Sequence, residues 1–223
     1  MSTTIAPRPS RPTTLGKPLV LCYHLVSPTW EHRLSISPKQ LLRQVRVLAR
    51  WWDVRVTFDD GFRSAATVFP QLRDLGVPIQ LFICSGYADD GRPLTIPELD
   101  GDDQLELATM TWDEVRAHAD DGVSIGAHTV SHPHLRTLGD EEVLRELRDS
   151  KEEIETVLGR SCTDFAYPYG EHDARVRSAV RAAGFERAYA LAHGTWNDPY
   201  ELPRLDLYRV HNVPKTIKAS LSV

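Results

Sequence analysis

Short apolar runs alternate along the chain with segments in which apolar residues recur every three or four positions. The runs are rich in β-branched residues, a pattern that predicts buried strands at 18–24, 54–58, 78–84, 123–127, 164–167, 187–191 and 205–210. The intervening segments carry helix signals, such as a serine followed by proline or a closing glycine. They predict helices at 37–49, 64–75, 111–122, 141–158 and 173–183.

The regular alternation of strands and helices predicts that the strands are parallel. About seven such units predict an α/β fold, in the form of a distorted or incomplete (β/α) barrel. Residues 87–110 are rich in Asp, Gly and Pro, and we expect a loop or insertion over the site there. Residues 1–17 are rich in Pro, Ser, Thr and Arg and predict a disordered leader, which leaves 18–223 as a single catalytic domain.

Charge and composition narrow the classes of partner. The 223-residue chain has a formal net charge of −5, which argues against a nucleic-acid-binding surface. No apolar run reaches membrane-spanning length and residues 1–17 lack the apolar core of a signal peptide, so we expect no membrane insertion and a cytoplasmic protein. Cys22, Cys84 and Cys162 form no C-x-x-C pair and are interpreted as buried thiols. None of these features indicates an oligomeric state.

Polar residues lie at or just past the ends of several predicted strands, namely His24, Asp59, Asp60, His128 and Tyr169. In parallel α/β folds this edge of the sheet is the catalytic rim. The two aspartates are followed by Gly61, which breaks the strand into a turn. Because successive strand residues point to opposite faces, one aspartate can bind a metal while the other faces a substrate.

His128 and His132 are spaced i and i+4, which allows both rings to reach one ion. This spacing alone is weak evidence, with a solvated turn as the alternative, but here it follows an apolar strand, as Asp60 does. Two histidines and one carboxylate leave open coordination positions, as catalytic zinc requires. The remaining histidines lack such a context and are expected to be solvated or to support the site from outside: His118, His134, His172, His193 and His211.

Three motifs follow one another in the chain: TFDDG at 57–61, HTVSH at 128–132 and FAYPYG at 165–170. Together they resemble the polysaccharide deacetylase domain (NodB-like, carbohydrate esterase family four). The segment LCYH at 21–24 is similar to the branch that deacetylates biofilm poly-N-acetylglucosamine. The resemblance extends from residue 18 to residue 211, which is nearly the whole chain.

The resemblance implies roles for individual residues. It assigns the general base to Asp59, and the metal ligands to Asp60, His128 and His132. It assigns the lining of a substrate groove to Tyr167, Pro168 and Tyr169. The backbone N–H of Tyr169 is expected to stabilise the tetrahedral oxyanion together with the metal.

The chain departs from the family pattern just before the Pro-Tyr element. The arginine expected there is missing, and Phe165 or Ala166 takes its place. We expect Arg204 to replace it by tethering Asp59, with Arg209 as a second candidate. A surface arginine is the alternative for either residue.

A second departure concerns the general acid. The late Leu-x-His of the family is absent, and His193 and His211 fit its place poorly. In the biofilm branch a histidine on the first strand takes this part, so His24 is the candidate for protonating the departing amine. The alternative for His24 is a core histidine hydrogen-bonded to a backbone carbonyl.

These assignments predict a metal-dependent hydrolase that removes an acetyl or other small acyl group from an amide nitrogen. The expected substrate is an N-acylated amino sugar, a glycan or a related small molecule. The expected metal is zinc, with cobalt, nickel or iron as alternatives. Three other interpretations remain open: hydrolysis of a non-sugar amide on the same scaffold, a non-haem iron oxygenase with a His/His/Asp triad, and a binding module that has lost catalysis.

Overall fold

The computed structural model describes residues 16–99, 103–191 and 194–207. Its main feature is a seven-stranded sheet with the order β8-β7-β6-β5-β4-β1-β9, in which every neighbouring pair is parallel. The strands are β1 (Leu19–Tyr23), β4 (Val54–Phe58), β5 (Ile79–Ile83), β6 (Ser124–Ala127), β7 (Asp164–Ala166), β8 (Arg187–Tyr189) and β9 (Leu205–Asp206). The last strand pairs with the first, while β8 and β9 form the two edges of the sheet. The predicted incomplete barrel of parallel strands is therefore confirmed.

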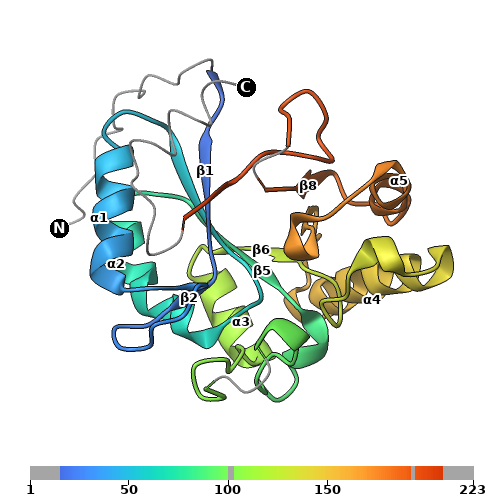
Figure 1. The fold of residues 1–223 in the computed structure, drawn as a ribbon, viewed down its shortest axis with the longest axis horizontal. Coiled ribbons are helices and arrows are strands. Elements are labelled where there is room, and N and C mark those ends of the chain that lie inside the picture. Colours follow the sequence, from blue (N-terminus) through green and yellow to red (C-terminus); the bar gives the residue numbers. More distant parts are fainter. Residues whose placement is uncertain (1–15, 100–102, 192–193, 208–223) are drawn as a thin grey trace.

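In the described part of the chain, five α-helices lie around these strands (Figure 1). They are α1 (Pro38–Leu48), α2 (Phe69–Asp74), α3 (Trp112–Asp120), α4 (Asp140–Leu158) and α5 (Ala174–Ala182). The predicted end signals are present. Ser37 caps α1 by accepting the N–H of Gln40 at 3.3 Å, and Thr111 and Glu114 form a capping box at α3. Gly159 ends α4 in the left-handed conformation, at φ 64°, which glycine adopts without strain.

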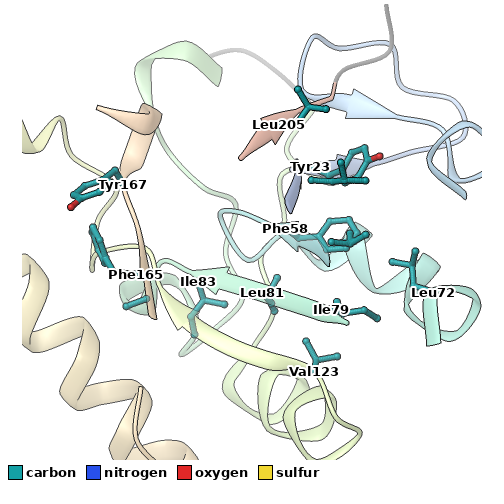
Figure 2. Close-up of a cluster of buried hydrophobic side chains, with 14 of the residues drawn as sticks. Tyr23, Phe58, Leu72, Ile79, Leu81, Ile83, Val123, Phe165, Tyr167 and Leu205 are labelled. Atoms are coloured by element: carbon teal, nitrogen blue, oxygen red, sulfur yellow. The ribbon is translucent and has the colours of Figure 1, made fainter. Parts of the chain in front are cut away.

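Strand alternation divides the buried side chains into two sets. The ring centroids of Tyr23 and Phe58, on the neighbouring strands β1 and β4, lie 5.9 Å apart. Both rings belong to the large core between the sheet and the helices (Figure 2). Intervening residues form a smaller cluster on the other face, which includes Val20, Phe82 and Ala166. The second face is the interior of the half-barrel. Polar residues just past the carboxyl ends of the strands form the candidate site.

The structure differs from the predicted elements in two places. The helix predicted at 64–75 is a 3-10 turn, η2 (Arg63–Val68), followed by the shorter α2. Proline lacks an N–H and is best tolerated in the first turn, so Pro70 favours a helix that begins at Phe69. Two strands of two residues each, β2 (Leu25–Val26) and β3 (Ser35–Ile36), were not predicted because such short strands have no readable periodicity.

Within the predicted irregular segment, residues 87–99 and 103–110 carry no α-helix or strand, and the 3-10 turns η3 (Ser85–Tyr87) and η4 (Pro97–Leu99) lie at its start and middle. The segment contributes Leu94, Ile96 and Leu107 to a small apolar cluster that also includes Leu25, Leu34 and Phe62. The three cysteines are buried and unpaired, as predicted. None of the described helices is long and apolar enough to cross a membrane. The predicted leader lies outside the described residues, apart from positions 16 and 17.

Candidate metal centre and active site

Four strands deliver the candidate residues to one edge of the sheet. His24 follows β1, Asp59 and Asp60 follow β4, His128 follows β6, and η6 (Pro168–Gly170) comes just after β7. Because all these strands are parallel, their carboxyl ends lie at the same edge. The rim predicted from the sequence therefore exists as a cluster in space.

Asp60, His128 and His132 form a buried cluster. Oδ1 of Asp60 lies 3.3 Å from Nε2 of His128 and 3.2 Å from Nε2 of His132. Nδ1 of His128 donates a hydrogen bond of 2.8 Å to the carbonyl oxygen of Ala166. This contact leaves the Nε2 lone pair of the neutral ring facing Asp60, which is the orientation that a metal-binding histidine requires.

The donor set and spacing of this cluster fit a divalent metal ion. One ligand atom from each of the three side chains lies within 4.8 Å of the other two. Asp60 Oδ1 is buried, yet it accepts no hydrogen bond from any described residue. A buried carboxylate oxygen without a hydrogen bond is costly, and so are lone pairs that face it; a shared cation would satisfy all three atoms.

The backbone that carries these ligands is held in an uncommon conformation. Asp60, Thr129 and His132 have φ values of 71°, 70° and 61°, in the left-handed region that residues other than glycine seldom adopt. The Oγ1 of Thr129 accepts the backbone N–H of His132 at 2.9 Å, which bends the loop between the two histidines. Such outliers concentrate at binding and catalytic sites.

Asp59 makes a two-point contact with Arg204. Nη1 of Arg204 donates to Oδ1 at 2.6 Å, and Nη2 donates to Oδ2 at 2.8 Å. The guanidinium also donates to the carbonyl of Ala190 and to Oγ1 of Thr57. The side chain of Arg204 is 0% exposed, so it is not a surface arginine. The predicted contact between Arg204 and Asp59 is present.

The two aspartates are ionised for different reasons. Burial alone would raise the pKa of Asp59, but the neighbouring Arg204 charge outweighs this effect and lowers it. Burial would also raise the pKa of Asp60, but a positive charge on His132 and contacts with both rings when they carry protons hold this pKa well below its ordinary value. The acid/base chemistry of the first carboxylate therefore depends on an arginine, and that of the second on the histidine pair.

Cys22 on β1 and His24 just after it lie on the same face of the sheet as Asp59, the candidate base, which follows β4. The sheet register pairs Cys22 with Thr57, so the strand alternation carries His24 and Asp59 onto that face two residues later. The thiol of Cys22 donates to Oδ2 of Asp59 at 3.4 Å. Cys22, His24 and Asp59 each have a ligand atom within 4.8 Å of the others. Arg204 already supplies positive charge to both oxygens of Asp59, so a second cation is disfavoured there.

Tyr169 lies at the rim beside the metal cluster. Its ring is 4.6 Å from that of His132, and the ring of His134 stacks on it at 3.8 Å. Its φ of 60° places it in the left-handed region, and its side chain is partly exposed. Pro168, which precedes it, is buried. Of the three residues predicted to line a groove, Tyr169 has the most accessible side chain.

The prediction that Tyr167 lines a substrate groove is wrong. Its side chain is fully buried, and its hydroxyl donates to the carbonyl of Tyr200 at 2.7 Å. Burial raises the pKa of this hydroxyl well above its ordinary value. The strand alternation explains the error, because Ala166 faces the half-barrel interior and Tyr167 packs in the opposite core.

One residue near the site was not identified from the sequence. Glu146 on α4 accepts hydrogen bonds from the backbone of Val130 and Ser131 in the histidine motif. No local motif marks Glu146, because these contacts join residues 15 and 16 positions apart. The candidates Arg209, His193 and His211 lie outside the described residues.

Comparisons with known proteins indicate one family for this chain. The family model for polysaccharide deacetylase matches residues 53–188. YxkH of Bacillus subtilis (strain 168), whose name places it among polysaccharide deacetylases, is 23% identical over 142 residues, which are 63% of this chain and 45% of that protein. Chitin deacetylase 1 of Cryptococcus neoformans var. grubii serotype A is 41% identical over 63 residues, 28% of this chain and 13% of that protein. The chain thus matches less than half the length of either relative.

A solved structure shares the fold. IcaB from Ammonifex degensii superposes with a TM-score of 0.72 at 21% identity, over 91% of this chain and 96% of that one. The segment matched by the family model covers more than half of the chain and contains both aspartates and both histidines of the cluster. The chain belongs to the polysaccharide deacetylase family.

Proposed function

We propose that this protein is a metal-dependent hydrolase that removes an acetyl group from the amide nitrogen of an N-acetylated amino sugar. The observation that carries the proposal is the pair of contrasting carboxylates at the rim. Asp60 shares a buried cluster with His128 and His132, while Asp59, the preceding residue, is ionised beside Arg204. Family membership supports a deacetylase, and the clustered side chains offer candidates for the metal ligands and for the general base.

In the proposed mechanism Asp60, His128 and His132 hold one divalent ion, with zinc as the first choice and cobalt, nickel or iron as alternatives. Such an ion would supply Lewis acidity toward an acyl oxygen and would acidify a water. Asp59 is the proposed general base, which takes a proton from the water that attacks the acyl carbon. Arg204 keeps Asp59 ionised and fixes its orientation through two hydrogen bonds.

The departing amine needs a proton, and His24 is the proposed donor. It lies at the end of β1, is partly exposed, and is close enough to both aspartates for its charge to lower their pKa values. The backbone N–H of Tyr169 is the proposed protein donor to the oxyanion, since this residue borders the metal ligand His132. Acetate and a free amine are the products.

The proposed substrate class is an N-acetylated glycan. The support is the family description and the names of relatives that act, by name, on polysaccharide and chitin. The motif at 21–24 favours the branch that acts on poly-N-acetylglucosamine. The facial-triad oxygenase alternative drew on the ligand set alone, and neither the parallel-strand fold nor the family model favours it.

The direct test is acetate release from a graded set of substrates. The purified protein, loaded with zinc, would be incubated with N-acetylglucosamine and with β-1,6- and β-1,4-linked oligomers of increasing length. Acetate would be measured enzymatically, and the deacetylated sugars by mass spectrometry. We expect zinc-dependent acetate release that increases with oligomer length. Zinc-loaded protein that releases no acetate from any of these substrates would contradict the proposal.

A further inference from the structure

A carboxylate on α4 contacts the loop that joins the two metal-site histidines. Oε2 of Glu146 accepts the backbone N–H of Val130 at 2.8 Å and that of Ser131 at 3.0 Å. Oε1 accepts the hydroxyl of Ser131 at 2.7 Å. Consecutive N–H groups after a left-handed residue form an anion-binding concavity, and here Thr129 is that residue.

The same loop is held from its other side by the segment after β5. The backbone N–H groups of Ser85 and Gly86 donate to the carbonyls of Thr129 and Val130, each at 3.1 Å. The approach is close, because a Cβ built on Gly86 would lie 2.9 Å from the carbonyl oxygen of Val130. The loop's carbonyls thus face η3, while its N–H groups face α4.

This loop needs outside support because of its conformation. Thr129 and His132 both have positive φ, at 70° and 61°, and non-glycine residues persist there only when their surroundings impose it. Glu146 is anchored for that task by its flanking residues Val143 and Leu147, which are fully buried on α4. Its three hydrogen bonds link α4 to Val130 and Ser131, the two residues before His132, and so affect how the His132 ring is oriented.

We propose that Glu146 is a positioning residue of the metal centre. Its carboxylate holds the loop at 128–132 in the left-handed geometry that lets both histidines present Nε2 to the oxygen of Asp60. The inference rests on the proposed function, since it assumes that His128 and His132 bind a metal. Residues that orient metal ligands from outside typically contribute about 10- to 100-fold in metal affinity.

The test measures zinc affinity by competition with a chromophoric chelator, using purified metal-free protein. Glu146→Ala removes all three acceptor contacts and is expected to weaken zinc binding about 10- to 100-fold. Glu146→Gln keeps an oxygen for the two N–H groups and an amide that can donate to the Ser131 hydroxyl. The glutamine variant is therefore expected to lose much less affinity than the alanine variant.

Glu142→Ala is the matched control. Glu142 lies on the same helix and also accepts a backbone N–H, that of Gly139 at 3.0 Å, but it does not contact the histidine loop. We expect Glu142→Ala to bind zinc like the wild type, even if its metal-free form unfolds at lower urea. The visible spectrum of cobalt-loaded protein should change in Glu146→Ala and stay unchanged in Glu142→Ala.

The outcomes separate this inference from the proposed function. Wild-type zinc affinity in Glu146→Ala would overturn the positioning role and leave the metal centre intact. Equal losses of affinity in Glu146→Ala and Glu142→Ala would also overturn it, because they would indicate a general effect of α4 stability. A wild-type protein that binds no zinc would instead refute the metal centre itself, and this inference with it.

Discussion

The carboxylate of Asp59 lies against a guanidinium and a thiol, whereas the carboxylate of Asp60 lies against two imidazole rings. Asp59 is satisfied by protein donors on both oxygens, while Oδ1 of Asp60 accepts no hydrogen bond from the described residues. Both are almost fully buried and both are ionised. The oxygens of Asp59 are satisfied by protein donors, whereas the Asp60 cluster would be completed by the proposed cation.

The backbone explains how adjacent residues reach such different surroundings. Asp59 continues the alternation of β4 and faces the half-barrel interior with Thr57, which lies beside Arg204. Asp60 has a φ of 71°, so the chain turns there and directs the second carboxylate toward β6. A single left-handed residue thereby separates the proposed proton acceptor, Asp59, from the proposed metal ligand, Asp60.

The largest expected effect comes from removing a histidine on the Asp60 side. His128→Ala and His132→Ala each delete one of three protein ligands, and we expect both variants to lose the metal and the deacetylase activity. Metal content after gel filtration, measured by mass spectrometry, checks this. His118→Ala, on α3 and packed against Phe69, is the control that should retain the metal. Full metal occupancy in either ligand variant would show that the ligands are assigned wrongly.

Substitution of His24 tests the proposed proton transfer to the leaving amine, on the Asp59 side of the site. If it protonates the leaving amine, His24→Ala should retain metal affinity and lose about 10²–10⁴-fold in turnover on amides. Aryl acetate esters have leaving groups that scarcely need a proton, so their hydrolysis should decrease far less. Steady-state rates on both substrates provide the measurement. Equal losses on amide and ester would indicate a packing or positioning role in place of acid catalysis.

Arg204 tests why Asp59 is ionised. Arg204→Met leaves a buried carboxylate without its partner, which typically costs about 3–5 kcal/mol in the free energy of unfolding. The pKa of Asp59 should rise, so the acid limb of the pH profile of kcat/KM should move to higher pH. Urea unfolding and the pH profile are the two measurements. Arg187→Met, which breaks a pair with Asp164 at the start of β7, should leave the pH profile unchanged.

The same contact predicts how stability depends on pH. The pKa of Asp59 is lower in the folded protein than its ordinary value of 3.8, so ionised Asp59 stabilises the fold fully above that value. This contribution is lost as the pH falls through the lowered folded pKa. The free energy of unfolding should therefore decrease less steeply in acid for Asp59→Asn than for the wild type. Parallel curves for both proteins would contradict this account of the Arg204 contact.

Local patterns in the sequence predicted much of this molecule. The positions of the strands, the serine cap of α1 and the capping box at Thr111 follow from patterns within a few residues. The proximity of Asp60 and His128 was also predictable, because both lie just past strands whose carboxyl ends meet at one edge of a parallel sheet, and the i, i+4 spacing adds His132. These features depend on order and spacing, which a sequence displays directly.

The features that the sequence did not reveal depend on contacts between distant residues or on which face of the sheet a side chain points to. Arg204 was one of two candidates to tether Asp59, and only the fold brings these residues, 145 positions apart, into contact. Glu146 had no local signal. Tyr167 was assigned to the groove because it belongs to the FAYPYG motif. Neighbouring strand residues point to opposite faces, and the side chain of Tyr167 points into the core.

The most direct test of the central claim compares Asp59→Asn with Asp60→Asn in the same preparation, measuring bound zinc and acetate release for each. We expect Asp59→Asn to bind zinc like the wild type and to lose about 10²–10⁴-fold in deacetylation rate. We expect Asp60→Asn to lose zinc and, with it, activity. Equal loss of zinc in both variants, or full activity in Asp59→Asn, would contradict the division of roles between the two carboxylates.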